Sequence, residues 1–243
     1  MPQILPATIE NLKLSSKIIC DTNILISYFD INSEFNSTIK STLNGIADED
    51  CEIEFLYTLI SYLEGIEFMR RKTLTVVFNS TLGIVPISKR SRSLELYRKF
   101  SQYNSENEIP YFLDHQIKKI REAIIKASAN GHEEWKKMLT LQAKQGFLSN
   151  FYQFNTLKAF TFAKPNESTE YPADNLKAWI TWHKVEDIIR SHGTSHLDSA
   201  ILSLTKVANG IDGFLSNDRD LLTSVLNGSL PPTIRTYTFL EGY

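Results

Sequence analysis

Residues 17–26, with the sequence KIICDTNILI, decide the fold class of this chain. The first four residues form a short apolar run, and Asp21-Thr22-Asn23 interrupts it. Apolar residues then return at helical spacing, at positions 24, 25, 28 and 29. This order predicts a buried strand that leads directly into a helix, with a carboxylate at the junction, which is typical of the opening of an α/β domain.

The same strand and helix signals follow along the first quarter of the chain. A helix is expected over residues 34–44, with Ser33 as its N-cap and Gly45 as its C-terminal stop. Residues 51–57 alternate enough to form a strand, and residues 59–72 favour a helix that ends in the cations Arg70-Arg71-Lys72. These elements extend the α/β pattern of the opening motif.

The C-terminal end repeats this architecture. Ser195 is a good N-cap for a helix that ends near Asn209-Gly210, and residues 213–216 read as a buried strand. A helix over 218–226 and a last strand over 233–239 follow. Strands that alternate with helices predict a parallel sheet covered by helices on both faces.

The middle of the chain is predicted to be mostly helical. Apolar residues recur at helical spacing at positions 113, 117, 120 and 124, and polar segments at 101–110 and 164–173 are expected to be loops. The α/β portions on either side are each too small to bury a core alone. We therefore expect one domain over residues 1–243 with a helical insertion over residues 95–193.

Composition limits the class of protein. The chain has 243 residues, 42% hydrophobic and 22% charged, which is ordinary for a globular protein and excludes collagen-like structure or general disorder. No apolar run reaches the roughly 18 residues that a membrane span needs, and the N-terminus lacks a secretory signal pattern. A cytoplasmic protein without membrane partners is expected. Cys20 and Cys51 are too few for a disulfide framework and are expected to be buried free thiols.

Charge is unevenly distributed along the chain. Residues 89–164 carry 14 Lys and Arg against 7 Asp and Glu, whereas the remainder carries 12 against 21. A basic surface beside an acidic centre is what a protein that handles polyanions through a metal would need. Solvated amphipathic helices rich in Lys are the alternative explanation of the basic stretch.

Four acids are candidates for chemistry. Asp21 follows the first strand, Asp198 lies near a helix start, and Asp218 follows the strand that ends in Ser216. Because parallel strands end at one edge of a sheet, where α/β sites form, these side chains are expected to converge. Glu64, in the helix after the second strand, is placed to reach the same edge.

Clustered carboxylates repel one another unless a cation neutralises them. Acids without His or Cys ligands suit Mg²⁺ or Mn²⁺, and a divalent ion held in this way can activate a water for phosphodiester hydrolysis. Helix capping by Asp21, Asp198 and Asp218, with Glu64 as an ordinary exposed helical residue, is the alternative for each acid taken singly.

Four motifs together resemble the PIN-domain nucleases. They are IICDTNIL at 18–25, SYLE at 61–64, HLDSAIL at 196–202 and FLSNDRDL at 214–221, with 20 positions between the last two acids. The resemblance covers about residues 16–88 and 194–240. It implies a three-layer α/β/α sandwich with a central parallel sheet of about five strands, and Mg²⁺- or Mn²⁺-dependent cleavage of RNA.

By position, the resemblance implies that Asp21, Glu64, Asp198 and Asp218 are the catalytic, metal-binding acids, with Asn23 and Ser216 as supporting polar groups. RNA is the expected partner, and a homodimer is a further candidate. The 134 positions between Glu64 and Asp198 exceed what small toxin-type members need. The length therefore does not support an antitoxin-type partner.

Two functional hypotheses follow. The first is a metal-dependent endoribonuclease whose basic insertion positions RNA through Lys118, Lys119 and Arg121, placed along the approach to the acids. The second is a catalytically weak RNA-binding or scaffold module of the same fold. Phe and Tyr residues between 147 and 154 are expected to belong to the core, because they recur at helical spacing.

Overall fold

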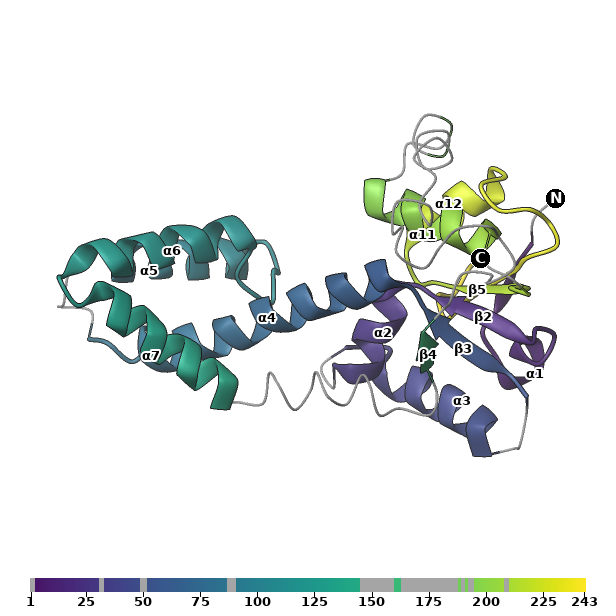
Figure 1. Cartoon of the computed structure of the whole chain (residues 1–243), viewed down its shortest axis with the longest axis horizontal. Coiled ribbons are helices and arrows are strands. Elements are labelled where there is room, and N and C mark those ends of the chain that lie inside the picture. The colour runs from purple at the N-terminus through teal and green to yellow at the C-terminus, as the bar shows by residue number, and fades with distance from the viewer. Residues whose placement is uncertain are drawn as a thin grey trace, which may run out of the picture. The chain divides into compact units, whose positions relative to one another are not determined.

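The computed structural model describes residues 3–30, 33–48, 52–86, 91–144, 160–162, 188, 191, 195–207 and 210–243. It divides into two compact units (Figure 1). The first comprises residues 1–65 and 157–243, and the second comprises residues 66–156. The expected insertion over 95–193 overlaps the second unit without sharing its bounds, and the aromatic residues between 147 and 154 lie outside the described residues.

The first unit is built on a parallel sheet of six strands, one more than the approximate number expected. Their order is β1-β6-β5-β2-β3-β4, and every neighbouring pair is parallel. The strands are β1 (Ile4–Pro6), β2 (Lys17–Cys20), β3 (Glu54–Tyr57), β4 (Phe160–Phe162), β5 (Gly213–Leu215) and β6 (Arg235–Thr238). The opening motif thus supplies a central strand.

Helices cover both faces of this sheet, which confirms the predicted three-layer α/β/α fold (Figure 1). One face carries α2 (Thr22–Phe29) and α3 (Asn36–Asp48), and the other carries α11 (His196–Val207) and α12 (Arg219–Leu226). A short helix, α1 (Ile9–Leu12), follows β1. The sequence patterns indicate neither β1 nor α1, because three strand residues and four helical residues are too few for a periodic pattern to repeat.

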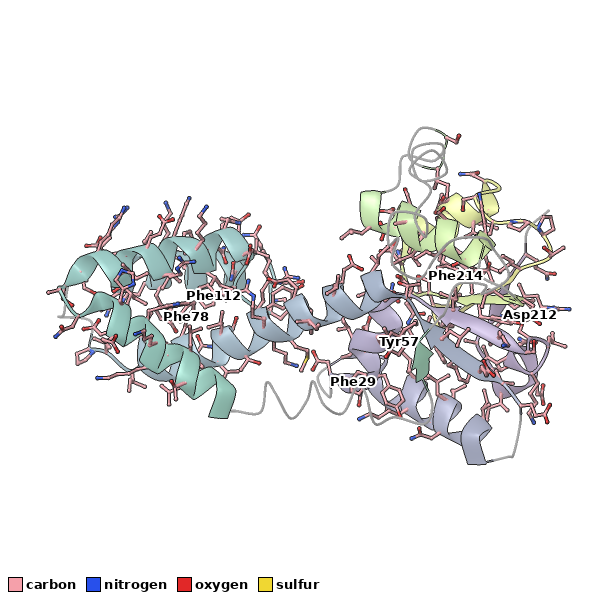
Figure 2. All side chains as sticks on the ribbon, viewed as in Figure 1. Phe29, Tyr57, Phe78, Phe112, Asp212 and Phe214 are labelled. Atoms are coloured by element: carbon pink, nitrogen blue, oxygen red, sulfur yellow. The ribbon has the colours of Figure 1, made fainter. Side chains whose placement is uncertain are left out.

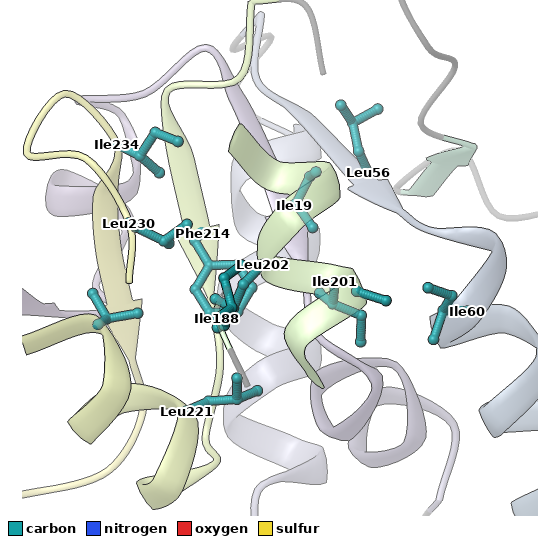
Figure 3. Close-up of a cluster of buried hydrophobic side chains, with 12 residues drawn as sticks. Ile19, Leu56, Ile60, Ile188, Ile201, Leu202, Phe214, Leu221, Leu230 and Ile234 are labelled. Carbon is teal, nitrogen blue, oxygen red and sulfur yellow. The ribbon is translucent and has the colours of Figure 1, made fainter. Parts of the chain in front are cut away.

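The core beneath α11 and α12 follows from strand alternation (Figure 3). Ile19, Leu56 and Phe214 point to this face from β2, β3 and β5. They pack against buried residues of α11 and α12, among them Leu202 and Leu221. Because side chains alternate along a strand, the neighbouring Ile18 and Cys20 face the other side, where Cys20 is a buried free thiol as predicted. Cys51 lies outside the described residues.

Gly45 does not end its helix, contrary to the prediction. Helix α3 continues to Asp48, and a Cβ on Gly45 would lie 3.2 Å from Cδ1 of Ile9. The missing side chain therefore makes room for α1 against α3, instead of permitting a left-handed turn. A distant packing partner explains this glycine better than the local capping rule.

Helix α4 (Leu59–Thr81) is longer than predicted, and the boundary between the two units lies within it. The cations expected to end it at residue 72 are internal. Arg70 forms ion pairs with Glu67 and Asp114, and the Arg71 guanidinium lies 5.0 Å from the ring centre of Tyr111. Beyond them Leu74 and other apolar residues continue the helix into the core of the second unit.

The second unit contains the C-terminal part of α4 with α5 (Arg92–Glu106), α6 (Asp114–Ala127) and α7 (Gly131–Lys144). Helix α5 occupies part of the loop predicted over 101–110, because Phe100 and Asn104 are buried and hold its last turns in place. Phe78 and Phe112, labelled in Figure 2, pack edge to face in the core, with their ring centroids 5.6 Å apart. Asn104 and Gln116 exchange two side-chain hydrogen bonds of 3.1 and 2.8 Å, which tie α5 to α6.

Candidate metal-binding edge of the sheet

Asp21 lies at the junction predicted from the sequence. It follows β2 directly and is the N-cap of α2, where its Oδ1 accepts a 2.7 Å hydrogen bond from the Thr22 amide. Its own amide donates to the Leu215 carbonyl at the end of β5, at 2.9 Å. The carboxylate is only 3% exposed. The carboxyl ends of β2 and β5 therefore meet at this residue.

The second oxygen of Asp21 is also engaged. Oδ2 accepts hydrogen bonds from Nδ2 of Asn23 at 2.7 Å and from Oγ of Ser216 at 2.9 Å. Burial raises the pKa of the Asp21 carboxyl from its ordinary 3.8 to about 7, and the nearby carboxylates Asp198 and Asp218 also raise it. The hydrogen bonds from Ser216 and Thr22 act in the opposite direction. Asp21 is thus held firmly among like charges in a place that penalises its own charge.

Ser216 connects Asp21 to Asp218. Its fully buried hydroxyl donates a hydrogen bond to Asp21. The same oxygen accepts hydrogen bonds from the Asp218 amide at 3.0 Å and from Nδ2 of Asn23 at 3.3 Å. Asn23 in turn accepts the Asn217 amide on its Oδ1 at 3.1 Å. The two predicted supporting residues therefore lie in one network with Asp21, at the ends of β2 and β5.

Asp218 caps α12. Its Oδ1 accepts the amides of Asp220 and Leu221 at 2.8 and 3.0 Å, which is the capping geometry considered from the sequence. Both bonds use the same oxygen, and within the described residues Oδ2 has no hydrogen-bond partner. Capping and ligand binding are therefore compatible at this carboxylate.

Glu64 lies in α4, within the first unit. Its Oε2 accepts a short hydrogen bond from the Thr22 hydroxyl, the residue that follows Asp21. Burial raises the pKa of Glu64, the Thr22 hydrogen bond lowers it, and the charge of Asp198 raises it. Glu64 is thus no ordinary exposed helical residue, because it accepts a hydrogen bond from Thr22 and interacts electrostatically with Asp198.

Asp198 lies in the first turn of α11 and is partly exposed. Its Oδ2 accepts the Ser195 hydroxyl at 2.7 Å, and its amide donates to that hydroxyl at 3.2 Å. The helix-start role anticipated for this residue is therefore present. Asp198 also raises the pKa of both Asp21 and Glu64, so its charge acts on both.

Electrostatic interactions thus link the four predicted acids: Asp21 with Asp198 and Asp218, and Glu64 with Asp198. In the described part of the chain, Glu64, Asp198 and Asp218 each keep one carboxylate oxygen without a hydrogen bond. Such a set of hard oxygen donors fits Mg²⁺ or Mn²⁺ in its chemistry. Among these same residues, however, no three Asp, Glu, His or Cys side chains already stand close enough together to hold an ion.

The three predicted RNA-binding cations lie elsewhere. Lys118, Lys119 and Arg121 are exposed on α6 in the second unit. Their expected position along the approach to the acids stays a prediction.

Two residues of the site were not predicted from the sequence. Thr22 stands directly after Asp21, and its β-hydroxyl beside an acid was the available signal. Asn217 accepts the Phe239 amide on Oδ1 at 2.9 Å and the Thr238 hydroxyl at 3.2 Å, joining the ends of β5 and β6. Its position between Ser216 and Asp218 was the only hint to this role.

Comparison with known proteins adds no relative. No protein-family model, curated protein or solved structure matches the chain. The resemblance to PIN-domain nucleases therefore rests on the four motifs alone. Across the described residues, no helix is long and apolar enough to cross a membrane.

Proposed function

We propose that this protein is a metal-dependent endoribonuclease with Asp21, Glu64, Asp198 and Asp218 as its acids. The observation that carries the proposal is the state of Asp21: a carboxylate 3% exposed, whose pKa of about 7 reflects burial and two further acids. Such an arrangement is costly for a structural carboxylate, and a bound cation would remove the cost.

The four acids would contribute to the proposed metal site in different ways. Asp21 is fixed by hydrogen bonds on both oxygens, from Thr22, Asn23 and Ser216, and would present a rigidly held carboxylate to a cation at the sheet edge. Within the described residues, Glu64, Asp198 and Asp218 each offer an oxygen free of hydrogen bonds. Mg²⁺ or Mn²⁺, when bound, would supply a water of lowered pKa and positive charge for the phosphate oxygens.

The choice of RNA as substrate follows the motif resemblance. A carboxylate-bound divalent ion suits hydrolysis of phosphodiesters generally, and the PIN-like motifs narrow this chemistry to RNA. The basic character of residues 89–164 agrees with a polyanionic substrate. A cytoplasmic location and a homodimer remain parts of the same proposal.

A second candidate is an RNA-binding or scaffold module with little turnover. Hydrogen bonds from Thr22, from Ser195 and from the first amides of α12 occupy one oxygen each of Glu64, Asp198 and Asp218. In the part of the chain that the structure describes, no three Asp, Glu, His or Cys side chains form a group that could hold an ion. This favours a structural use of each carboxylate. The buried charge of Asp21, which a scaffold does not need, favours the enzyme.

Cleavage assays separate the two candidates. End-labelled RNAs (single-stranded, hairpin and duplex) are incubated with the protein in Mn²⁺, in Mg²⁺ and in EDTA. The Asp21→Asn variant is run in parallel, and Glu10→Gln, which removes an exposed carboxylate of the same unit, is the matched control. Metal-dependent cleavage by the parent and by Glu10→Gln, but not by Asp21→Asn, supports the nuclease. RNA binding without cleavage under every condition supports the scaffold.

A further inference from the structure

The exposed side of α6 carries an unneutralised group of cations. Lys118, Lys119, Arg121 and Lys126 are all exposed, and within the described residues none of them has an ion pair or side-chain hydrogen bond. Glu122 is the one acid among them whose side chain is also without a partner there. The exposed side of α6 therefore keeps a net positive charge.

Some exposed cations outside α6 are neutralised by neighbouring acids. Lys17 pairs with Glu54, Arg92 with Glu95 and Lys136 with Glu133. Leaving four cations unpaired along one helix concentrates positive potential, which is the electrostatic footprint of a polyanion site. Residues 118 to 126 extend over about 12 Å of helix.

Packing fixes this orientation. The apolar side of α6, with Ile117, Ile120 and Ile124, is buried in the core of the second unit. The cations on the remaining surface therefore cannot turn inward, and the helix has no free apolar face. A helix that binds at a membrane surface needs such a face to insert, so a lipid surface is disfavoured as the partner.

We infer that the exposed side of α6 binds the sugar-phosphate backbone of RNA, independently of the acids in the first unit. Lys118, Lys119 and Arg121 would contact phosphates and carry no base specificity, because α6 carries no Phe, Tyr or Trp for stacking. The choice of RNA among polyanions rests on the proposed function. Since phosphates are the recognised groups, single-stranded DNA of the same sequence should bind within a few-fold.

The test measures binding of a fluorescent single-stranded RNA by anisotropy, in EDTA, from 50 to 300 mM salt. The triple variant Lys118→Ala/Lys119→Ala/Arg121→Ala is compared with Lys17→Ala/Arg92→Ala/Lys136→Ala, which removes the same net charge from paired cations. For single strands each phosphate contact contributes about 0.7 to the slope of log K against log salt. The α6 variant should therefore lose about 2 from this slope and bind all RNA sequences more weakly, whereas the control should change little.

A second variant, which changes the charge in the opposite sense, guards against misfolding of the triple variant. Glu122→Gln removes the acid from the same surface and should tighten RNA binding severalfold at low salt. Unchanged affinity and slope in both α6 variants, an equal loss in the paired-cation control, or binding to phosphatidylserine vesicles in place of RNA would overturn the inference.

The same experiment keeps the two proposals apart. If the protein binds RNA through α6 but never cleaves RNA, the inference about α6 is supported and the proposed nuclease function is wrong. If the protein cleaves RNA in a metal-dependent way and the α6 variants bind RNA as tightly as the parent, the proposed nuclease function is supported and the inference about α6 is wrong.

Discussion

The Ser216 hydroxyl donates a 2.9 Å hydrogen bond to Oδ2 of Asp21, although the two residues are 195 positions apart in the chain. Both are buried, at the ends of the neighbouring parallel strands β5 and β2. The same hydroxyl accepts the Asp218 amide. One side chain therefore fixes the distance between the first and the last acid of the proposed site.

Ser216→Ala should destabilise the fold more at pH 8.5 than at pH 5. The lost hydrogen bond favours the charged form of Asp21, whose pKa is about 7, so its loss matters most when that carboxylate is ionised. We expect about 1–3 kcal/mol at the higher pH, because a buried acceptor and the Asp218 amide lose a partner. Urea unfolding without divalent metal at both pH values measures this. An equal loss at both would contradict the role assigned to the hydroxyl.

Asp21→Asn should make the metal-free protein more stable than the parent above pH 7. Because the folded-state pKa of about 7 lies above the ordinary 3.8, the parent holds a proton in the folded state that the unfolded chain releases. The parent therefore loses stability as pH rises from about 4 to above 7, by on the order of 4 kcal/mol at most. The variant lacks this loss. Urea unfolding at pH 5 and 8.5, with Glu10→Gln as control, tests it, and a variant that fails to fold would mark Asp21 as structural.

Thr22→Val should weaken Mn²⁺ binding about 10-fold, whereas Thr22→Ser should bind like the parent. The Thr22 hydroxyl donates to one oxygen of Glu64, and within the described residues the other oxygen has no hydrogen bond. Removal of a group that orients a metal ligand typically costs 10–100-fold in affinity. Valine has the shape of threonine without the hydroxyl, so packing is preserved. Calorimetric titration with Mn²⁺ provides the measurement. Equal affinity in the valine and serine variants would show that the hydroxyl does not orient Glu64.

Asp212→Ala should destabilise the first unit by about 1–2 kcal/mol, since the lost hydrogen bonds are partly exposed. The Asp212 carboxylate, labelled in Figure 2, accepts the Ser16 amide at 3.0 Å and the Lys17 amide at 2.9 Å, which joins the starts of β5 and β2. Asp212→Asn keeps one acceptor oxygen and should lose less. Thermal unfolding compares them, and equal losses would locate the effect in the charge rather than in the hydrogen bonds.

Local signals in the sequence were enough for the central strands and for the positions of Asp21 and Asp218 at strand ends. The apolar run 17–20 with Asp21 behind it gives both β2 and the N-cap of α2, because burial and capping act within a few residues. The N-cap position of Asp218, after β5 and at the start of α12, is predicted by the same strand-then-cap pattern. Such features need no knowledge of the partner segments.

Features that depend on distant partners were not predictable in this way. Gly45 looked like a helix stop because its packing partner, Ile9, lies in another helix. Arg70 looked like a helix end because Asp114, which neutralises it, is 44 positions away. The Thr22–Glu64 hydrogen bond likewise joins residues 42 positions apart and has no local pattern.

Binding of Mn²⁺ tests the central claim, that four carboxylates form one metal site, most directly. The signal of free Mn²⁺ in electron paramagnetic resonance is followed during titration of the parent, Glu10→Gln and the single variants Asp21→Asn, Glu64→Gln, Asp198→Asn and Asp218→Asn. The account predicts saturable uptake by the parent and by Glu10→Gln, and a loss of affinity in each of the four single variants. A parent that takes up no Mn²⁺, or single variants that bind it as tightly as the parent, would contradict the account.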